Sequence, residues 1–345
     1  MGRTTKDQAA IVTTTMDRRR FLAVSTMAGA GLTVASSLSW PATKAFARNR
    51  PRTPNRPLFG AYCRPTGSQS WEDALSSLET EAGRTMSITR HYYRWDEAVP
   101  DDFARSAAAG GRVPFVSIHA FTKKGVYIPW AEIAAGVHDE QLKTWATSLQ
   151  SWGVKGYLNF HHEPENDLAC GTGADFTAAF AHVQSVFDAQ GVTNFTWGVS
   201  LMASTLKGGH GGADQWLPDP SLYRVLIVDG YNRFPSDAAS SHWRSFEEIF
   251  KPAHEQAQAR GKHLLIGEYG TVEQTAGGYR NGSPTAKAQW LTDAAATMKT
   301  WPEVVGAIYS HTTAVYGGQV MDYWADSSAP SLTGFTDCGH DTFFS

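Results

Sequence analysis

The chain has 345 residues, of which 42% are hydrophobic and 18% are charged, and this balance is that of an ordinary globular protein rather than of a disordered or fibrous one. The formal net charge of −3 supplies no basic field for nucleic acid or for an anionic membrane surface. We therefore expect neither a nucleic-acid partner nor a stable membrane association.

Residues 1–47 are predicted to be an export signal rather than part of the fold. The stretch "DRRRFLA" is similar to the twin-arginine signal, whose pattern is S/T-R-R-x-F-L-K, and departs from it at Asp17 and Ala23. A mildly apolar segment rich in Gly, Ala, Ser and Thr follows, and "AFA" at 45–47 has the small-x-small form of a cleavage site. We expect the twin-arginine export machinery to deliver a secreted, extracellular protein with a Pro/Arg-rich leader at 48–57.

Export would place the three cysteines, Cys63, Cys170 and Cys338, in an oxidising compartment. Cys63 follows the apolar run "LFGAY", which indicates a buried structural thiol. Cys170 and Cys338 are then the tentative disulfide pair, and the alternative that both stay free is left open.

Eight short apolar runs rich in β-branched and aromatic residues recur from residue 58 onward. They cover 58–63, 86–93, 113–120, 156–162, 194–200, 224–232, 263–270 and 304–311. Most of them do not alternate between polar and apolar residues, which is typical of parallel strands that are covered on both faces.

Amphipathic helical patterns fill most of the gaps between these runs. The well-defined patterns lie at 70–84, 131–153, 174–191, 242–262 and 285–301, whereas 101–111 is a short helix at best and 201–220 is mostly loop. Eight strands alternating with helices predict an α/β fold, a single-domain (β/α)8 TIM barrel over residues 58–345. A doubly wound open sheet is the rival, but no strand–GxGxxG–helix unit opens the chain.

Polar and titratable residues gather at the ends of six of the runs, where a barrel of this type carries its chemistry. They are Arg90, His91 and Tyr92; His119; His161, His162 and Glu163; Asp229, Tyr231 and Asn232; Glu268 and Tyr269; and Tyr309 and His311. Glu163 and Glu268 end the fourth and seventh runs, so they are expected to face each other across one mouth. Such a pair breaks glycosidic bonds: one carboxylic acid protonates the leaving oxygen and the other carboxylate attacks the anomeric carbon, with retention when the two lie about 5–5.5 Å apart.

The stretches "FHHEPEN" and "IGEYG" resemble the retaining barrel glycosidases whose catalytic glutamates lie on strands four and seven, and within them the β-mannanases of glycoside hydrolase family 26. In that family the acid/base glutamate follows a histidine, as in His162-Glu163, and the nucleophile lies in a Gly-Glu-aromatic-Gly strand end, matched by 267–270. "VDGYN" and "GGRVPFVSIHA" resemble its sixth and third strands. The chain departs from the family in reading "PEN" where "MNG" is common, and in lacking a tryptophan in "AIYSHTT". The catalytic machinery therefore carries over better than the mannan specificity.

The resemblance implies a role for several of these residues. Glu163 would be the acid/base and Glu268 the nucleophile, with Tyr231 donating a hydrogen bond to Glu268 and His162 lying near the acid/base and the sugar. The remaining candidates for sugar contacts or for positioning the glutamates are His119, Arg90, His91, Trp95, Tyr269, Tyr309 and His311. The tryptophans of predicted loops are either sugar platforms or packed under those loops, and they are Trp95, Trp130, Trp216 and Trp324.

We therefore expect a secreted retaining glycoside hydrolase that acts on a β-linked polysaccharide or oligosaccharide, with β-1,4-mannan first and β-glucan or xylan second. The alternatives are a catalytically silent carbohydrate-binding barrel and a metal-dependent esterase or deacetylase acting on glycans. The metal alternative is disfavoured because the adjacent His161 and His162 would point to opposite sides of a strand, so no metal and no cofactor are expected.

Overall fold

The computed structural model describes residues 56–233, 242–273, 283–316 and 318–345. The predicted signal peptide at 1–47 and most of the predicted leader at 48–57 lie outside the described residues. None of the described helices is both long enough and apolar enough to pass through a membrane.

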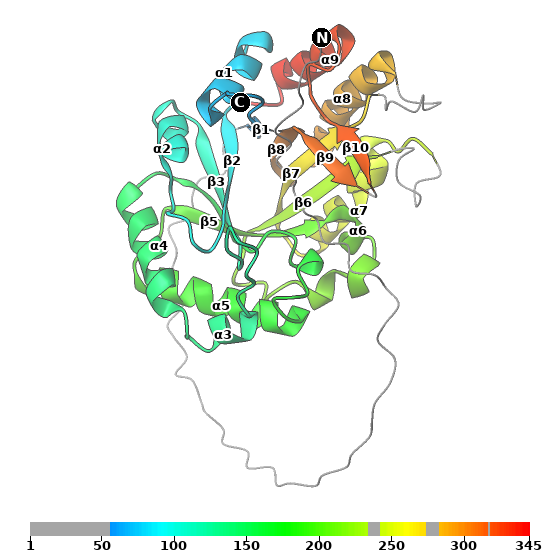
Figure 1. The fold of residues 1–345 in the computed structure, drawn as a ribbon. Helices are drawn as coiled ribbons and strands as arrows, with labels where there is room; N and C mark the ends of the chain where they lie inside the picture. The colour runs from blue at the N-terminus through cyan, green and yellow to red at the C-terminus, as the bar shows by residue number, and fades with distance from the viewer. Residues whose placement is uncertain (1–55, 234–241, 274–282, 317) are drawn as a thin grey trace, which may run out of the picture. The chain divides into compact units, whose positions relative to one another are not determined.

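Eight parallel strands form a closed barrel in which each strand lies beside its neighbours in the chain, and β8 completes the circle by pairing with β1 (Figure 1). The strands are β1 (Leu58–Cys63), β2 (Ile88–Tyr93), β3 (Val113–Ile118), β4 (Gly156–Phe160), β5 (Phe195–Met202), β6 (Val225–Asn232), β7 (His263–Thr271) and β8 (Val304–His311). All eight predicted strands and the (β/α)8 barrel are therefore confirmed, and the open sheet is excluded.

Helices cover the outside of the barrel (Figure 1). The α-helices are α1 (Trp71–Glu81), α2 (Asp102–Ala109), α3 (Trp130–Ala134), α4 (Asp139–Trp152), α5 (Gly173–Ala189), α6 (Ala203–Leu206), α7 (Phe246–Ala259), α8 (Pro284–Met298) and α9 (Ala329–His340). The other described elements are the 3-10 turns η1 (Pro164–Asn166), η2 (Gly209–Gly211) and η3 (Ala213–Gln215), and an antiparallel hairpin of β9 (Thr313–Tyr316) and β10 (Gln319–Asp322).

The helices differ from the predicted ones at two places. The pattern at 131–153 divides into α3 and α4, because Gly136 between them adopts a left-handed φ of 80°. The helix α9 has no counterpart among the predictions, since Gly334 and Gly339 lower its helix propensity. Both glycines permit close packing, because an added Cβ would lie 2.6 Å from Ala288 Cα at the first and 2.7 Å from the Phe59 ring at the second.

Capping residues fix where the helices begin after the strands. Ser70 and Thr172 each form a capping box at the start of α1 and α5, in which the hydroxyl accepts from the backbone N–H of the third helical residue and the carboxylate of that residue accepts from the cap. Asp101 caps α2 by accepting from Ala104 N. These caps fix the first turns of the helices that follow β1, β2 and β4, on the side of the barrel where those strands end.

The barrel interior is apolar over most of its length and polar near the carboxyl ends of the strands. Ile88 and Ile227 belong to the apolar interior cluster, and two residues further along the same strands Arg90 and Asp229 are buried polar groups. A larger apolar core fills the space between strands and helices. Side chains alternate between these two environments along each strand, so neighbouring residues at a strand end have different surroundings.

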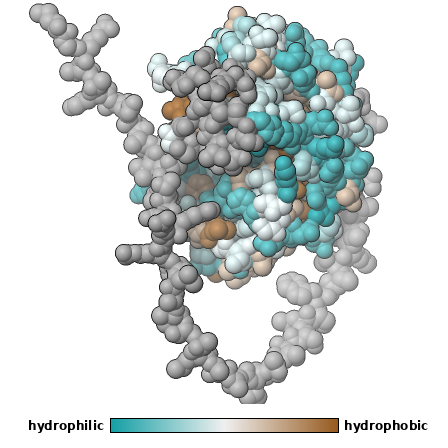
Figure 2. Space-filling model, turned by 90° about the vertical axis from the view of Figure 1, so that its right-hand side faces the viewer, coloured by the Kyte–Doolittle hydropathy of each residue, from teal (hydrophilic) through white to brown (hydrophobic). Residues whose placement is uncertain are grey.

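The surface mixes polar and apolar residues. On the face drawn in Figure 2, hydrophobic colour is confined to small separate spots among hydrophilic residues, which is ordinary for a folded protein. The exposed large hydrophobic side chains of the described residues are Trp71, Val126, Tyr127, Val137, Leu168, Val315 and Val320.

All three cysteines are buried and free, so the tentative Cys170–Cys338 disulfide is wrong. The Cys170 thiol donates to Ala120 O (3.4 Å), whereas Cys338 in α9 lies 3.9 Å from the Tyr269 hydroxyl. The two thiols therefore occupy different parts of the packing around the barrel. Burial is the main cause that raises the pKa of both thiols to about 12.

Candidate active site

The chain leaves β4 through a turn that carries Glu163. His161 and Glu163 have left-handed φ angles of 56° and 47°, which are uncommon for residues other than glycine. Glu163 N donates to Ser200 O (3.1 Å), and Asn166 N donates to Glu163 O (3.0 Å) across η1. These bonds hold a backbone conformation that the chain would otherwise avoid, and they keep Glu163 at the carboxyl end of the barrel.

The Glu163 carboxyl group lies in surroundings that favour its protonated form. Burial raises the pKa of Glu163 to about 8, and the negative charges of Asp229 and Glu268 act in the same direction against the lowering effect of His162. Asn166 Nδ2 donates to Glu163 Oε2 (2.8 Å) and fixes the orientation of the group. A carboxylic acid that keeps its proton at neutral pH is able to act as a general acid.

Glu268 reaches the mouth because β7 contains a β-bulge. Pairing with β6 runs up to Val228↔Ile266 and resumes at Asp229↔Glu268, so Gly267 is an extra residue in β7. If β7 paired without the bulge, with Gly267 opposite Asp229, strict alternation would turn the side chain of Glu268 toward the helices. Glycine is required at this position, because an added Cβ would lie 2.7 Å from Asp229 Oδ1.

Donors on both oxygens hold the Glu268 carboxylate. The Tyr92 hydroxyl donates to Oε1 and the Tyr231 hydroxyl donates to Oε2, while Arg90 Nη1 lies 3.3 Å from Oε1. The Tyr231 hydroxyl is also 2.8 Å from Ser310 Oγ, which fixes its position. These contacts orient the carboxylate and stabilise its negative charge.

The two glutamates meet at the imidazole of His162. Its Nε2 atom lies 3.8 Å from Glu163 Oε2 and 3.5 Å from Glu268 Oε1. The separation of these two oxygens therefore cannot exceed the sum of the two distances, 7.3 Å. This limit includes the roughly 5–5.5 Å of a retaining pair and excludes most of the ~6.5–9.5 Å range of an inverting pair.

A buried charge network lies beneath His162. Arg90 Nη1 donates to Asp229 Oδ1 (2.8 Å), and neither side chain is exposed. Ser200 Oγ donates to Asp229 Oδ2 (2.6 Å), which is also 3.0 Å from His162 Nδ1. Burial alone would raise the pKa of Asp229, but the charges of Arg90 and His162 hold it well below its usual range.

The network also sets the protonation state of His162. Burial and the Arg90 charge disfavour the imidazolium, yet the carboxylates of Glu163 and Asp229 raise the pKa of His162 to about 9. Its Nδ1 atom lies 2.6 Å from Arg90 Nη2 and 3.0 Å from Asp229 Oδ2, and it either accepts from the first or donates to the second. When Nδ1 accepts from Arg90, and equally in the imidazolium that the raised pKa favours, Nε2 carries a proton that points toward the two glutamates.

The other two histidines of this region differ in role. His119 lies at the mouth, with its ring 5.6 Å from that of His162 and 6.1 Å from that of Tyr92, and burial is the main cause that lowers its pKa well below the usual value. His161 points away from the mouth, where its Nδ1 accepts from Ala120 N (3.1 Å) and its Nε2 lies 2.9 Å from Asp167 Oδ2. His161 therefore anchors the turn rather than facing the glutamates.

Three of the predicted residues at strand ends face the helices instead of the mouth. His91 Nε2 lies 2.9 Å from Thr89 Oγ1 on the outside of β2. The fully buried rings of Tyr269 and Tyr309 pack against each other at 5.2 Å between barrel and helices. Their neighbours in the chain, Tyr92 among them, take the inward positions because side chains alternate along a strand.

The predicted tryptophan platforms are mostly packed under loops. Trp95 is 8% exposed and packs against Trp145 at 4.9 Å. Trp130 and Trp216 are buried as well, and Trp130 Nε1 donates to His161 Nδ1 (3.3 Å). Neither these side chains nor that of Trp95 offers a ring face to the mouth.

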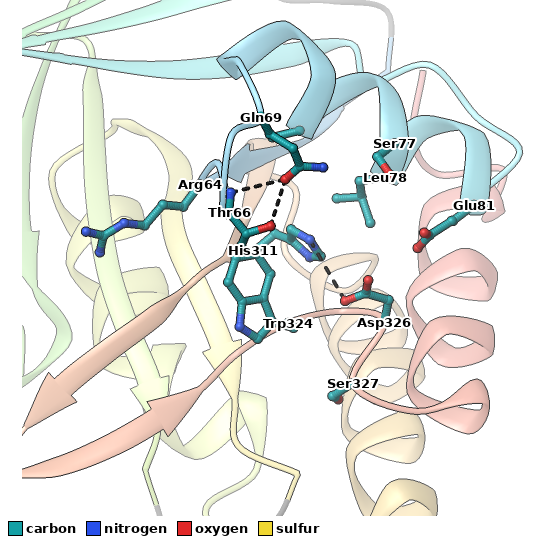
Figure 3. Close-up of a pocket in the computed structure, with 11 residues that line it drawn as sticks. Arg64, Thr66, Gln69, Ser77, Leu78, Glu81, His311, Trp324, Asp326 and Ser327 are labelled. Atoms are coloured by element: carbon teal, nitrogen blue, oxygen red, sulfur yellow. Dashed lines mark hydrogen bonds and ion pairs between the residues drawn. The ribbon is translucent and has the colours of Figure 1, made fainter. Parts of the chain in front are cut away.

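His311 and Trp324 line a separate pocket of about 300 Å³ between α1 and the segment that follows β10 (Figure 3). Their rings lie 4.6 Å apart, and His311 Nδ1 accepts from Ala325 N (3.1 Å). Burial lowers the pKa of His311 to about 4, and its Nε2 atom lies 3.9 Å from Asp326 Oδ1. Neither glutamate of the proposed catalytic pair lines this pocket, so the structure does not bring His311 into the mouth.

The site also contains residues to which the sequence assigned no role. Tyr92 and Asp229 were predicted only as members of polar strand ends. Tyr92 lies two residues after Arg90 on β2, and Asp229 lies two residues before Tyr231 on β6. This spacing places each of them on the inward face of its strand, and it is the feature that could have identified them. Ser200 gives no such signal, because a serine within an apolar strand is common and its partners come from other strands.

Two groups of described residues bring potential metal ligands within 4.8 Å of one another: His119, His161 and Asp167, and His162, Glu163 and Asp229. In the first group His161 Nδ1 already accepts two N–H donors, and in the second Arg90 supplies the positive charge at 2.8 Å from Asp229 Oδ1. Neither group leaves a set of free ligand atoms that fits a metal ion.

No protein-family model matches the chain. It is similar to endoglucanase H of Acetivibrio thermocellus, with 23% identity over 287 residues that make up 79% of this chain. The chain spans 29% of the length of that relative.

The solved structures that share the (β/α)8 barrel of this chain include β-mannanases of glycoside hydrolase family 26. The catalytic domain of the family 26 endo-β-1,4-mannanase of Bacillus sp. JAMB-750 has a TM-score of 0.57 and 15% identity, over 85% of this chain and 88% of that one. The family 26 β-mannanase of Bacteroides ovatus has a TM-score of 0.56 and 13% identity, over 85% and 90%. A fungal β-1,4-galactanase has a TM-score of 0.57 and 12% identity, over 76% and 89%.

Proposed function

We propose that the chain is a retaining glycoside hydrolase that cleaves a β-linked polysaccharide. The observation that carries the proposal is the pair of glutamates, one in the turn after β4 and one on β7, which lie near the same imidazole nitrogen and differ in environment. Glu163 has a pKa raised to about 8, whereas two tyrosine hydroxyls and Arg90 stabilise the charge of Glu268. A pair whose environments divide the roles of acid and nucleophile is what double displacement needs.

The geometry supports the following sequence. Glu163 donates its proton to the glycosidic oxygen while Glu268 attacks the anomeric carbon, and the C–O bond to the leaving group breaks. Glu163, now a carboxylate, then takes a proton from water, which attacks the glycosyl-enzyme and releases Glu268. One negative charge moves from Glu268 to Glu163 and back, and the His162 imidazolium lies within 4 Å of both positions, so it stabilises the charge wherever it is.

We place β-1,4-mannan first among the substrates, because family 26 mannanases share the barrel and the stretch around His162-Glu163 resembles the acid/base motif of that family. β-Glucan is second, supported by the similarity to an endoglucanase. Residues 1–47 are proposed to direct export through the twin-arginine machinery. Fusing them to a reporter and replacing Arg18 and Arg19 by lysine tests this, because export that persists in the variant would contradict the twin-arginine route.

The test of the activity is reducing-sugar release from β-mannan, β-glucan, xylan and β-galactan by the wild type, Glu163→Gln and Glu268→Gln. We expect cleavage of at least one glycan by the wild type and a loss of at least about 10³-fold in both variants, the order expected when a catalytic group is removed. Proton NMR of the first product resolves the anomeric outcome, and initial inversion would refute the double displacement. Wild-type inactivity on all four glycans together with unimpaired binding would favour the silent carbohydrate-binding barrel.

A further inference from the structure

Trp71 lies on the core-facing stripe of α1 but is left partly uncovered. It is one helical turn before Leu75 and two before Leu78, yet it is 38% exposed where these residues are 4% and 1% exposed. The capping box of Ser70 fixes the first turn of α1, which follows the carboxyl end of β1 in the chain. An indole on the core-facing stripe of a helix that is still 38% exposed differs from an apolar residue scattered on the surface.

The indole is held from behind by a row of aromatic rings that leads to the catalytic pair. Phe103 stacks on it at 5.9 Å and 26°, and Tyr62 contacts it at 5.5 Å. The ring of Tyr62 is 5.2 Å from that of Tyr92 in an edge-on arrangement, and the Tyr92 hydroxyl donates to Glu268. The row is therefore continuous from the proposed nucleophile to Trp71.

We propose that Trp71 forms a sugar-binding subsite at the rim of the same barrel mouth, in which a pyranose ring of the β-glycan stacks on the exposed part of the indole. The inference rests on the proposed function and adds to it where the substrate lies. A pyranose presents C–H groups on its faces, and a rigid aromatic ring binds such a surface while the sugar hydroxyls stay in water.

The chemistry also assigns the direction of the chain. Glu163 protonates the leaving oxygen, so the leaving half of the glycan extends on the side of Glu163. The half that becomes attached to Glu268 extends the other way, and Trp71 is connected to Glu268 through Tyr62 and Tyr92. Trp71 thus binds the glycone half, beyond the sugar that is attacked.

The subsite is tested by Trp71→Ala and Trp71→Phe on β-oligosaccharides of increasing length, built from the glycan that the wild type cleaves. A remote contact that is used in the transition state raises kcat/KM only once the substrate is long enough to reach it. We expect the wild-type kcat/KM to rise at that length and Trp71→Ala to lose roughly tenfold of it, the order of one aromatic contact, while shorter substrates are cleaved as by the wild type. Trp71→Phe retains most of the rise.

Trp152→Ala is the matched control, because this partly buried tryptophan ends α4 at the opposite end of the barrel and packs against Phe195 at 6.1 Å. It is expected to change thermal stability but not the length dependence. Binding of the longest oligosaccharide to Glu268→Gln with and without Trp71→Ala, measured by calorimetry, gives a second readout of the same loss. An active wild type whose rates Trp71→Ala lowers equally at all lengths, or not at all, refutes the subsite alone, whereas a wild type that cleaves no glycan refutes the proposed function.

Discussion

Replacing Asp229 by asparagine is expected to destabilise the protein more than a surface charge change would. Asp229 and Arg90 form a 2.8 Å ion pair in which neither side chain is exposed, and asparagine keeps the volume while removing the charge. Leaving one partner of a buried pair uncompensated costs about 3–5 kcal/mol. Arg90 retains a contact with Glu268 at 3.3 Å, so we expect the lower end, about 3 kcal/mol, and a fall in Tm of roughly 6–12 °C.

Denaturant unfolding and calorimetry of Asp229→Asn measure this loss, and the exposed Asp337→Asn is the control, expected within about 0.5 kcal/mol of the wild type. The pKa of Asp229 is lowered in the folded state, so its contribution is fully present above the unfolded pKa, near ~3.9. It is lost as the pH falls through the lower folded value. At neutral pH a loss of less than about 1 kcal/mol, the value of an exposed pair, would refute the buried network.

The remaining predictions concern the acid, the nucleophile and the thiols. Because the protonated form of Glu163 is the active one and its pKa is about 8, kcat/KM should fall as the pH rises through that value; a profile that is flat to pH ~10 would contradict the assignment. Tyr92→Phe removes a donor to Glu268 and should lower kcat on the order of 10–100-fold, with a change in unfolding free energy of less than about 1.5 kcal/mol; an unchanged kcat would remove Tyr92 from the site. All three cysteines are buried and free, so a thiol reagent should label none of them in the folded protein and all three after unfolding without reductant; a single labelled thiol would indicate a disulfide.

The strands were predictable because parallel strands covered on both faces are continuous apolar runs, and eight such runs recur from residue 58 onward. The helix α9 was not, because Gly334 and Gly339, which its packing requires, resemble helix-breaking positions in the sequence. Close approach between distant segments is a tertiary property that periodicity does not contain.

The site was predictable only as far as strand ends could be identified. The inventory of polar strand ends included Glu163 and Glu268, but it also contained Tyr269 and Tyr309, which the structure places against the helices. To decide which of two neighbouring residues faces the mouth, the register of each strand must be known, and the register of β7 changes at a bulge. Partners from different strands, such as Ser200 and Asp229, carry no mutual signal in the sequence at all.

The extra glycine of β7 has a consequence for anyone comparing such chains. If β7 paired straight through, with Gly267 opposite Asp229, every later side chain of the strand would turn over, so that the phenol of Tyr269 would fill the mouth and the nucleophile would lie among the helices. A relative that keeps the glutamate but carries a larger residue in place of this glycine would lose the room beside Asp229 that the bulge needs, and with it the hydrolytic chemistry. The register of the strand against β6, rather than the letters around the acid, distinguishes a working copy from a silent one.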